Sequence, residues 1–249
     1  MHGAQGQASF PLTGDFLAGR LRDQFDAEDL DYIEGLVSEP RFLIDGERLI
    51  ARGEPAARST ILVEGFMFSS IVKDGRRHIV GVHVPGDFVD LHGFLLQRLD
   101  HDIVAAGPAR IAQVEHERLR EVTQERPGIT RALWFATLLD AAIHRQWIRN
   151  LEALDAPQRI AHLYAELHCR FGLIGRNASR TLRTPFTQTD LADMCGVSAI
   201  HANRAVARLR ELGLGEIRRG DLYTDNWTAI EAYAQFDASY LYPAGRPSL

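Results

Sequence analysis

The stretch TQTDLADMCGVSAIHANRAVARLRELGL, residues 187 to 214, decides the fold of the C-terminal part of this chain. Thr187 and Asp190 have the spacing of a capping box, which starts a helix just before a run of apolar residues. Gly196 ends that helix, because glycine adopts a positive φ without a Cβ clash, and Ser198 is a suitable N-cap for a second helix. The segment therefore predicts two short helices joined by a tight turn.

The second predicted helix, residues 198 to 212, has one apolar and one polar face. Its alanine, valine and leucine residues recur at three- and four-residue steps, which is typical of a buried helix side. On the other side Arg204 lies about two turns into the helix, where a guanidinium can donate to O6 and N7 of a guanine in the major groove. The residues expected to contact DNA bases or phosphates are Thr187, Gln188, Ser198, Ala199, His201, Asn203, Arg204, Arg208, Arg218 and Arg219. An ordinary amphipathic helix pair with solvated arginines is the alternative interpretation.

The segment after these helices favours DNA binding. Residues 214 to 224 predict a two-stranded hairpin with a Gly-Asp turn and two arginines near its tip, so the unit is a winged helix-turn-helix. The chain as a whole has a net charge of −5, but from residue 156 onward 11 arginines face nine acidic residues. A local cationic surface is what a polyanion requires. We assign residues 156 to 249 to this domain.

The N-terminal half has a different pattern. In residues 25 to 126, β-rich runs at 59 to 63, 66 to 72 and 78 to 84 alternate with glycines, which predicts a compact antiparallel β-roll. A short capped helix is expected at 26 to 37, and residues 1 to 24 are expected to be a flexible segment. The fold class is therefore α+β, with a β-roll followed by helices.

A long helix, residues 127 to 155, is predicted to connect the two domains. It is apolar almost all round, so it must be buried, partly on the roll and partly against a twin helix of a second copy. A stripe with alternating four- and three-residue steps is expected to form the dimer contact: Leu133, Thr137, Asp140, His144, Trp147 and Leu151.

The chain contains a β-roll, then a long helix, then a winged helix-turn-helix. In this order of parts it resembles the Crp/Fnr family of bacterial transcription regulators over about residues 25 to 225. The motifs that carry the resemblance are GERLIARG at 46 to 53, Val63-Glu64-Gly65, Asp74-Gly75, Gly86-Asp87-Phe88, and the 187 to 214 stretch with its Gly196-Val197-Ser198 and Asn203-Arg204. The resemblance implies a homodimer that binds the two halves of a palindromic double-stranded DNA operator, about 34 Å apart. It also implies RNA polymerase as a partner if the protein is an activator.

The departures from the family pattern concern the ligand. Where members that bind cyclic AMP have a glutamate for the ribose and an Arg-Ser or Arg-Thr pair for the phosphate, this chain has Leu91 and His101-Asp102. A carboxylate repels a phosphate, which argues against cyclic AMP and leaves the effector unidentified. The expected pocket residues are Asp90, Leu91, His92, Arg98, His101 and Asp102. No cysteine precedes Cys169, so the iron-sulfur cluster of the oxygen-sensing branch is not expected.

Two other function classes stay open. One is a receptor for a small ligand or cyclic nucleotide in which DNA binding is secondary. The other is a cupin-like metal enzyme, but the histidines of the roll lack the His-x-His pair that cupins use, so we expect no catalytic residue, metal or cofactor. His162, His168 and Cys169 are interpreted as helix packing. No apolar run approaches about 18 residues and no secretion signal is recognisable, so a cytoplasmic protein without a membrane span is expected.

Overall fold

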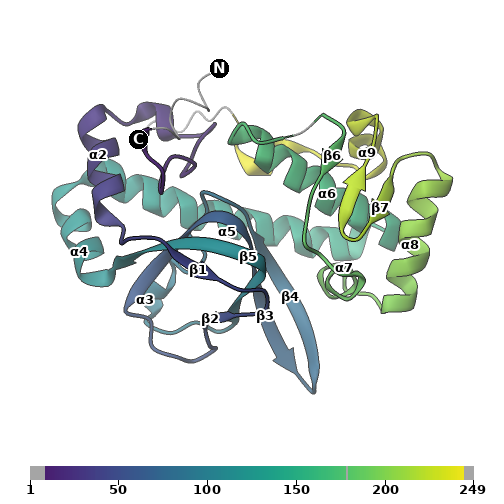
Figure 1. Cartoon of the computed structure of the whole chain (residues 1–249), viewed down its shortest axis with the longest axis horizontal. Helices are drawn as coiled ribbons and strands as arrows, with labels where there is room; N and C mark the ends of the chain where they lie inside the picture. Colours follow the sequence, from purple (N-terminus) through teal and green to yellow (C-terminus); the bar gives the residue numbers. More distant parts are fainter. Residues whose placement is uncertain (1–8, 178, 244–249) are drawn as a thin grey trace.

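The computed structural model describes residues 9–177 and 179–243. A β-sheet domain and a smaller helical domain are joined by the long helix α5, and the two described ends of the chain lie on the same side of the molecule (Figure 1). The sheet domain contains η1 Arg22–Gln24, α2 Ala27–Leu36, β1 Arg41–Leu43, β2 Arg48–Ile50, β3 Arg58–Lys73, β4 Arg76–His83, α3 Gly93–Leu96, β5 Asp102–Glu115 and α4 His116–Glu125. The remaining elements are α5 Pro127–Ala153, α6 Ala156–Leu173, β6 Thr181–Leu182, α7 Gln188–Cys195, α8 Ala199–Glu211, β7 Glu216–Arg218, β8 Asp221–Tyr223, α9 Trp227–Tyr233 and η2 Ala238–Leu241.

The N-terminal sheet is antiparallel, with strand order β1-β5-β3-β4 and β2 paired with β5. The sequence predicts two separate runs at 59 to 63 and 66 to 72, but β3 is one continuous strand. Gly65, with φ +88°, forms an irregularity in this strand, and the register shifts on both sides of Glu64. A Cβ at Gly65 would lie 2.4 Å from the Pro108 carbonyl oxygen, so glycine here allows a close approach of two strands rather than a chain break.

The N-terminal segment is packed, so the prediction of flexibility over residues 1 to 24 is wrong for residues 9 to 24. Phe16 and Leu21 are 1% and 0% exposed, and they share an apolar core with residues of α2, α4 and α5. Glu34 of α2 accepts hydrogen bonds from the backbone N–H groups of Leu12 (3.0 Å) and Thr13 (2.9 Å). Apolar burial and these backbone contacts outweigh the entropy of a free segment. Residues 1 to 8 lie outside the described residues.

The predicted stripe of α5 is only partly exposed, since Leu151 is 50% exposed and the other five residues of the stripe are half-buried. Leu133 packs on the N-terminal core, and Trp147 Nε1 donates to Glu166 Oε2 at 3.1 Å, so both contact their own chain. The large exposed apolar side chains of α5 include Trp134, Leu138 and Ile148, each one residue beyond a stripe position. Because α5 is apolar on nearly every side, its periodicity does not determine which side faces the chain's own core.

The C-terminal domain contains the predicted helix pair and hairpin, with two differences. The hairpin turn is Arg219-Gly220, both with positive φ, one residue before the expected Gly-Asp turn, and β6 adds a third strand to give the order β6-β8-β7. The stretch 227 to 240 forms two short helices, α9 and η2, with Gln235 at φ +49° between them. In the described parts of the chain, no helix is long and apolar enough to cross a membrane.

Candidate nucleic-acid interface and its junction with the sheet domain

The helix-turn-helix is built from local capping interactions, as predicted. Thr187 Oγ1 accepts from the Asp190 backbone N–H at 3.1 Å, and Asp190 Oδ2 accepts from the Thr187 backbone N–H at 2.8 Å. Gly196 at φ +65° ends α7, and Ser198 Oγ accepts from the His201 N–H at 3.3 Å to start α8. These caps fix where both helices begin, and therefore which side chains face solvent.

The buried face of α8 consists of small and aliphatic residues. Ala202, Ala205 and Leu209 are 1%, 2% and 3% exposed, and α8 packs on α6 and α7. Ala192 of α7 is also buried, which allows the two helices to cross closely. With this face committed to the domain core, the opposite face of α8 is directed outward, at the edge of the molecule (Figure 1).

All ten residues that we expected to contact DNA are exposed on α7, α8, their caps and the wing, and they are Thr187, Gln188, Ser198, Ala199, His201, Asn203, Arg204, Arg208, Arg218 and Arg219. Arg208 pairs with Glu211 at 3.3 Å and Arg218 with Glu216 at 2.5 Å, whereas Arg204 has no ion pair or hydrogen bond to any described residue. Sequence reasoning missed Ile200, whose side chain is 67% exposed beside them. Its apolar character suits the methyl group of a thymine.

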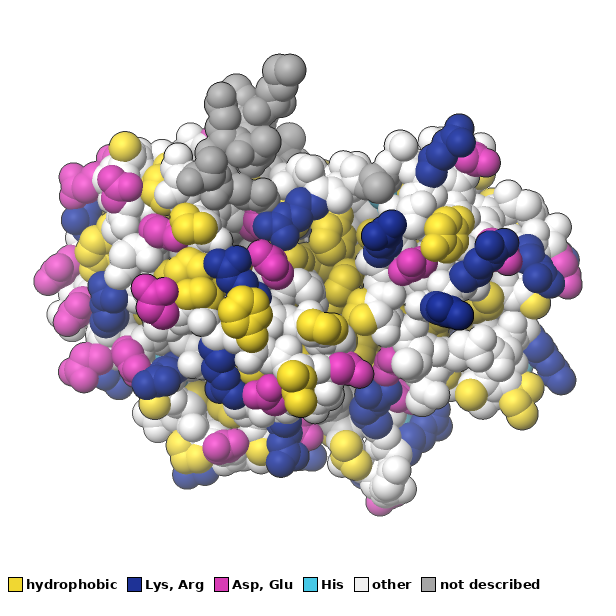
Figure 2. Space-filling view, in the orientation of Figure 1, with side chains coloured by type: hydrophobic (Ala, Val, Ile, Leu, Met, Phe, Trp, Pro, Cys, Tyr) yellow, Lys and Arg dark blue, Asp and Glu magenta, His cyan; other side chains and the backbone are white. Residues whose placement is uncertain are grey.

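The surface around α8 and the β7–β8 hairpin is rich in arginine, as the excess of basic over acidic residues in this part of the sequence predicts. Figure 2 shows dark blue Lys and Arg side chains distributed over the region of α8 and the β7–β8 hairpin. From Arg170 to Arg219 there are nine arginines and four acidic residues. Several of these arginines project from short, well-capped elements, so they form an ordered cationic surface of the kind that attracts phosphates.

Polar contacts join this domain to the N-terminal half at several places, including the Arg176–Asp15 ion pair and the hydrogen bond from Arg20 Nε to the Leu241 carbonyl oxygen (2.8 Å). Two further contacts reach the sheet and the loop after it, and the first of these is at the β3–β4 hairpin. Arg77 forms ion pairs with Asp190 and with Asp193, the latter at 2.9 Å. Arg76 Nη2 also donates to the Val197 carbonyl oxygen at 3.4 Å. Helix α7, the first helix of the DNA-binding motif, is therefore attached directly to the sheet domain.

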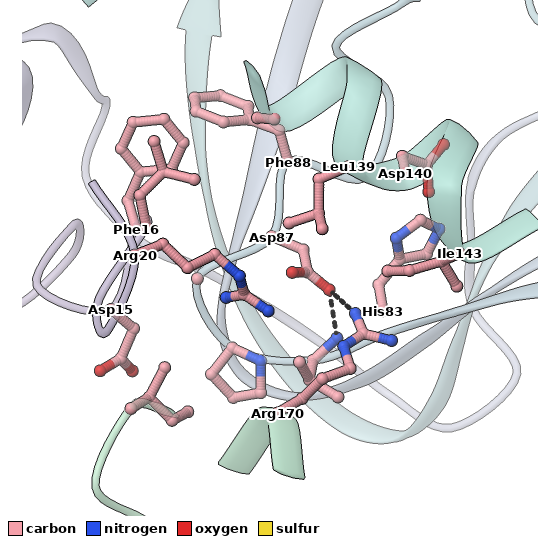
Figure 3. Close-up of a pocket in the computed structure, with 16 residues that line it drawn as sticks. Asp15, Phe16, Arg20, His83, Asp87, Phe88, Leu139, Asp140, Ile143 and Arg170 are labelled. Carbon is pink, nitrogen blue, oxygen red and sulfur yellow. Dashed lines mark hydrogen bonds and ion pairs between the residues drawn. The ribbon is translucent and has the colours of Figure 1, made fainter. Parts of the chain in front are cut away.

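The second contact is a buried ionic network, whose Arg170–Asp87 pair is drawn in Figure 3. The Arg170 side chain of α6 is 4% exposed, and it pairs with Asp87, pairs with Glu166 at 3.3 Å and donates to the Val82 carbonyl oxygen at 2.9 Å. Burial raises the pKa of Glu166. The positive charge of Arg170 and the hydrogen bonds donated by Tyr240 (2.8 Å) and Trp147 partly offset this rise. The network therefore ties α5, α6, the C-terminal η2 and the loop after β4 to one another.

The six residues predicted for the ligand pocket do not converge on one site. Two of them have structural roles: Asp90 Oδ1 accepts from the Thr60 N–H at 2.5 Å, and Leu91 lies in the apolar core. Burial raises the pKa of Asp90 to about 7. Two others bind nearby backbone, since Arg98 donates to Gly53 at 2.6 Å and Asp102 accepts from Arg52 at 2.7 Å.

His92 and His101 are the pair that the structure does bring together. Their ring centroids are 5.2 Å apart, and the Nε2 atom of each ring is buried without a hydrogen-bond partner in the described residues. His101 Nδ1 contacts Asp100 at 2.7 Å.

Within the described ranges, no group of three or more His, Cys, Asp or Glu side chains is arranged to hold a metal ion. Burial raises the pKa of the Cys195 thiol to about 12, so it stays protonated at neutral pH.

Comparisons with known proteins agree with this architecture. A family model described as a cyclic nucleotide-binding domain matches residues 40–126, and one described as a Crp-like helix-turn-helix domain matches residues 158–233. The chain is 25% identical over 188 residues to the transcriptional activator protein anr of Pseudomonas aeruginosa, covering 75% of this chain and 77% of that protein. It is also 25% identical over 210 residues to the nitrogen fixation regulation protein FixK of Bradyrhizobium diazoefficiens, covering 84% and 87%.

Among solved structures, FixK2 from Bradyrhizobium japonicum superposes with a TM-score of 0.72 at 20% sequence identity, over 80% of this chain and 98% of that chain. This likeness shows the fold. The matched sensor-like and helix-turn-helix domains, in the order and spacing observed here, establish the membership: this chain belongs to the Crp/Fnr family of bacterial transcription regulators.

Proposed function

We propose that this protein regulates transcription by binding a palindromic DNA operator as a homodimer, with α8 in the major groove. The observation that carries the proposal is the exposed Arg204 on a helix whose start is fixed by the Ser198 cap and whose opposite face is buried. An unpaired guanidinium held on a rigid helix is suited to bidentate recognition of guanine. Residues at helix starts, such as Thr187 and Gln188, are suited to phosphates.

The dimer contact in this proposal is the exposed apolar face of α5. Trp134, Leu138 and Ile148 are 68%, 59% and 68% exposed, and their spacing of four and ten residues places them on one side of the helix. Large apolar side chains gathered on one exposed helix face are typical of an interaction surface. Two copies joined here would give the twofold symmetry that a palindrome requires.

The remaining parts of the proposal concern partners. A regulator acts where the genome is, so we place the protein in the cytoplasm, with RNA polymerase as a further partner if it activates transcription. We assign it no catalytic activity and no cofactor. We also propose an effector other than cyclic AMP, because Leu91 is buried in the core and Asp102 is committed to the backbone of Arg52. The unpaired His92 and His101 nitrogens favour a ligand-receptor role as the second candidate function.

The test begins with selection of bound duplexes from a randomised library. Fluorescence anisotropy at fixed salt then compares Arg204→Ala with the unaltered protein on a selected and a scrambled duplex. We expect a loss of about 1 to 3 kcal/mol on the selected duplex and little change on the scrambled one. Arg120→Ala, exposed on α4 of the other domain, is the matched control. Equal losses on both duplexes would make Arg204 a phosphate contact, and no enriched duplex would refute the proposed function.

A further inference from the structure

Ile200 is an exposed apolar side chain on the face of α8 that is directed away from the domain core. Its side chain is 67% exposed, and it lies in the first turn of the helix, two residues after the Ser198 cap. The other exposed residues of α8 are polar, charged or alanine. We propose that Ile200 makes the protein select a thymine in each half of the operator, by contact with the C5 methyl group of that base. This inference rests on the proposed function, because it names a base that the same helix recognises.

The position of Ile200 on the helix follows from helical periodicity. Each residue turns an α-helix by about 100°, so Ala202, Ala205 and Leu209 lie about 140 to 200° around the helix from Ile200. These three side chains are 1%, 2% and 3% exposed and pack into the domain. Ile200 is therefore near the centre of the opposite face, which is the face that enters a major groove when α8 binds DNA.

The surroundings of Ile200 favour DNA rather than another protein as its partner. Between residues 187 and 211, all of which the structure describes, no other large apolar side chain is exposed. An apolar patch that marks a protein-binding surface contains several such side chains. Here one apolar group is flanked on the same face by Asn203 and the unpaired cation of Arg204. This surface is complementary to a polyanionic groove whose base edges carry one kind of apolar group, the thymine methyl.

The chemistry of the isoleucine side chain determines which base it favours. Isoleucine neither donates nor accepts a hydrogen bond, whereas cytosine presents an amino donor in the major groove where thymine presents a carbonyl oxygen and a methyl group. An aliphatic side chain that covers the cytosine donor would leave it without water or a partner, at an energetic cost. A β-branched side chain in a helix also has one strongly preferred χ1 rotamer, so little side-chain entropy is lost on contact. Ile200 therefore discriminates thymine from cytosine.

Arg204 indicates where the thymine lies. It follows Ile200 by four residues, which places it about 6 Å further along the helix axis and about 40° around it. Successive base pairs are about 3.4 Å apart along the duplex. A helix that lies along the groove therefore brings the two side chains to bases about two base pairs apart. We expect each half-site to contain a thymine at about this distance from the guanine assigned to Arg204.

The test uses duplexes enriched from the randomised library, with deoxyuridine in place of one thymine at a time. Deoxyuridine pairs with adenine as thymidine does and lacks only the C5 methyl group. Fluorescence anisotropy at fixed salt compares the unaltered protein with Ile200→Ser on each duplex. At one thymine of each half-site, we expect loss of the methyl group to weaken binding of the unaltered protein about fourfold, the effect of one buried methyl group. Ile200→Ser should bind the duplexes with and without this methyl group equally.

Two further variants serve as controls. Ile200→Val keeps a β-branched apolar side chain, so it should retain the loss of affinity on the methyl-free duplex. Leu212→Ser alters another partly exposed apolar residue (39%), at the C-terminal cap of the same helix and about 18 Å along the axis from Ile200. This variant should show the same fourfold effect as the unaltered protein. Because Ile200 is exposed, Ile200→Ser should fold normally, which circular dichroism checks.

The proposal is overturned if no thymine of an enriched duplex shows a methyl effect, or if Ile200→Ser shows the same methyl effect as the unaltered protein. A methyl-sensitive thymine with no guanine within about two base pairs would also overturn it. Equal affinity of Ile200→Ser and the unaltered protein for every duplex would leave the side chain to a protein partner instead. In each of these outcomes the protein still binds an enriched duplex. A failure of the proposed function differs, because no duplex is then enriched, and it overturns both.

Discussion

Replacing Arg170 by methionine should lower the free energy of unfolding, because this arginine is the centre of the buried network between the domains. The methionine side chain occupies a similar volume but donates no hydrogen bond. It would leave the Val82 carbonyl oxygen without its 2.9 Å donor, and Asp87 and Glu166 without their cation. Glu166, itself 1% exposed, could not gain water in compensation.

The expected size of this effect follows from burial. Removing one partner of a buried ion pair typically costs about 3 to 5 kcal/mol. Here the two carboxylates keep other donors, since Asp87 accepts from the Val84 N–H at 2.8 Å and Glu166 from Trp147 and Tyr240. We therefore expect the free energy of unfolding to fall by an amount near the lower end, about 3 kcal/mol.

Urea denaturation measures this change, followed by circular dichroism and tryptophan fluorescence at equal protein concentrations. The matched control is Arg180→Met, which breaks the Arg180–Asp225 pair at 3.3 Å, where both side chains are largely exposed (77% and 82%). An exposed pair contributes about 0 to 1 kcal/mol, so the control should change little. If Arg170→Met destabilises the protein no more than the control does, the network does not hold the domains together.

Three further predictions concern pH, backbone packing and assembly. The pKa of Asp90 is about 7 in the folded protein against 3.8 unfolded, so its stabilising effect is complete below about pH 4 and is lost by about pH 7, at up to about 1.4 kcal/mol per pH unit. Asp90→Asn should remove this part of the pH dependence in urea titrations, and parallel profiles would contradict the assignment. Gly65→Ala should lower the unfolding free energy about 1 to 3 kcal/mol more than Gly46→Ala, because both glycines have positive φ but a Cβ at Gly46 meets no described atom within 4 Å. Calorimetric melting tests this, and equal losses would show that the Pro108 contact is tolerated. Leu138→Glu should give monomers in light scattering, whereas Val72→Glu, at a similarly exposed apolar position, should not; a dimeric Leu138→Glu would exclude this face.

The sequence by itself determined the features that depend on neighbouring residues. The capping box of Thr187 and Asp190, the positive φ of Gly196 and the Ser198 cap are all confirmed, because each interaction spans at most three residues. The antiparallel sheet and the helix-turn-helix followed from periodicity and glycine positions for the same reason. The exposed polar face of α8 then followed from the burial of its apolar side.

Only the tertiary structure decided the features that depend on distant partners. Trp134, Leu138 and Ile148, the most exposed apolar side chains of α5, each lie one residue beyond a stripe position, while Leu151 of the stripe is exposed beside them, because several faces of this helix are apolar and packing selects among them. Arg170 and Asp87 are 83 residues apart, and Glu166 and Tyr240 are 74 apart, so no local pattern announces their contacts. The orientation of Asp90 toward Thr60 likewise arises from long-range packing. Short-range sequence patterns encode capping and amphipathicity, whereas the partner of a buried polar group depends on which surfaces exclude water together.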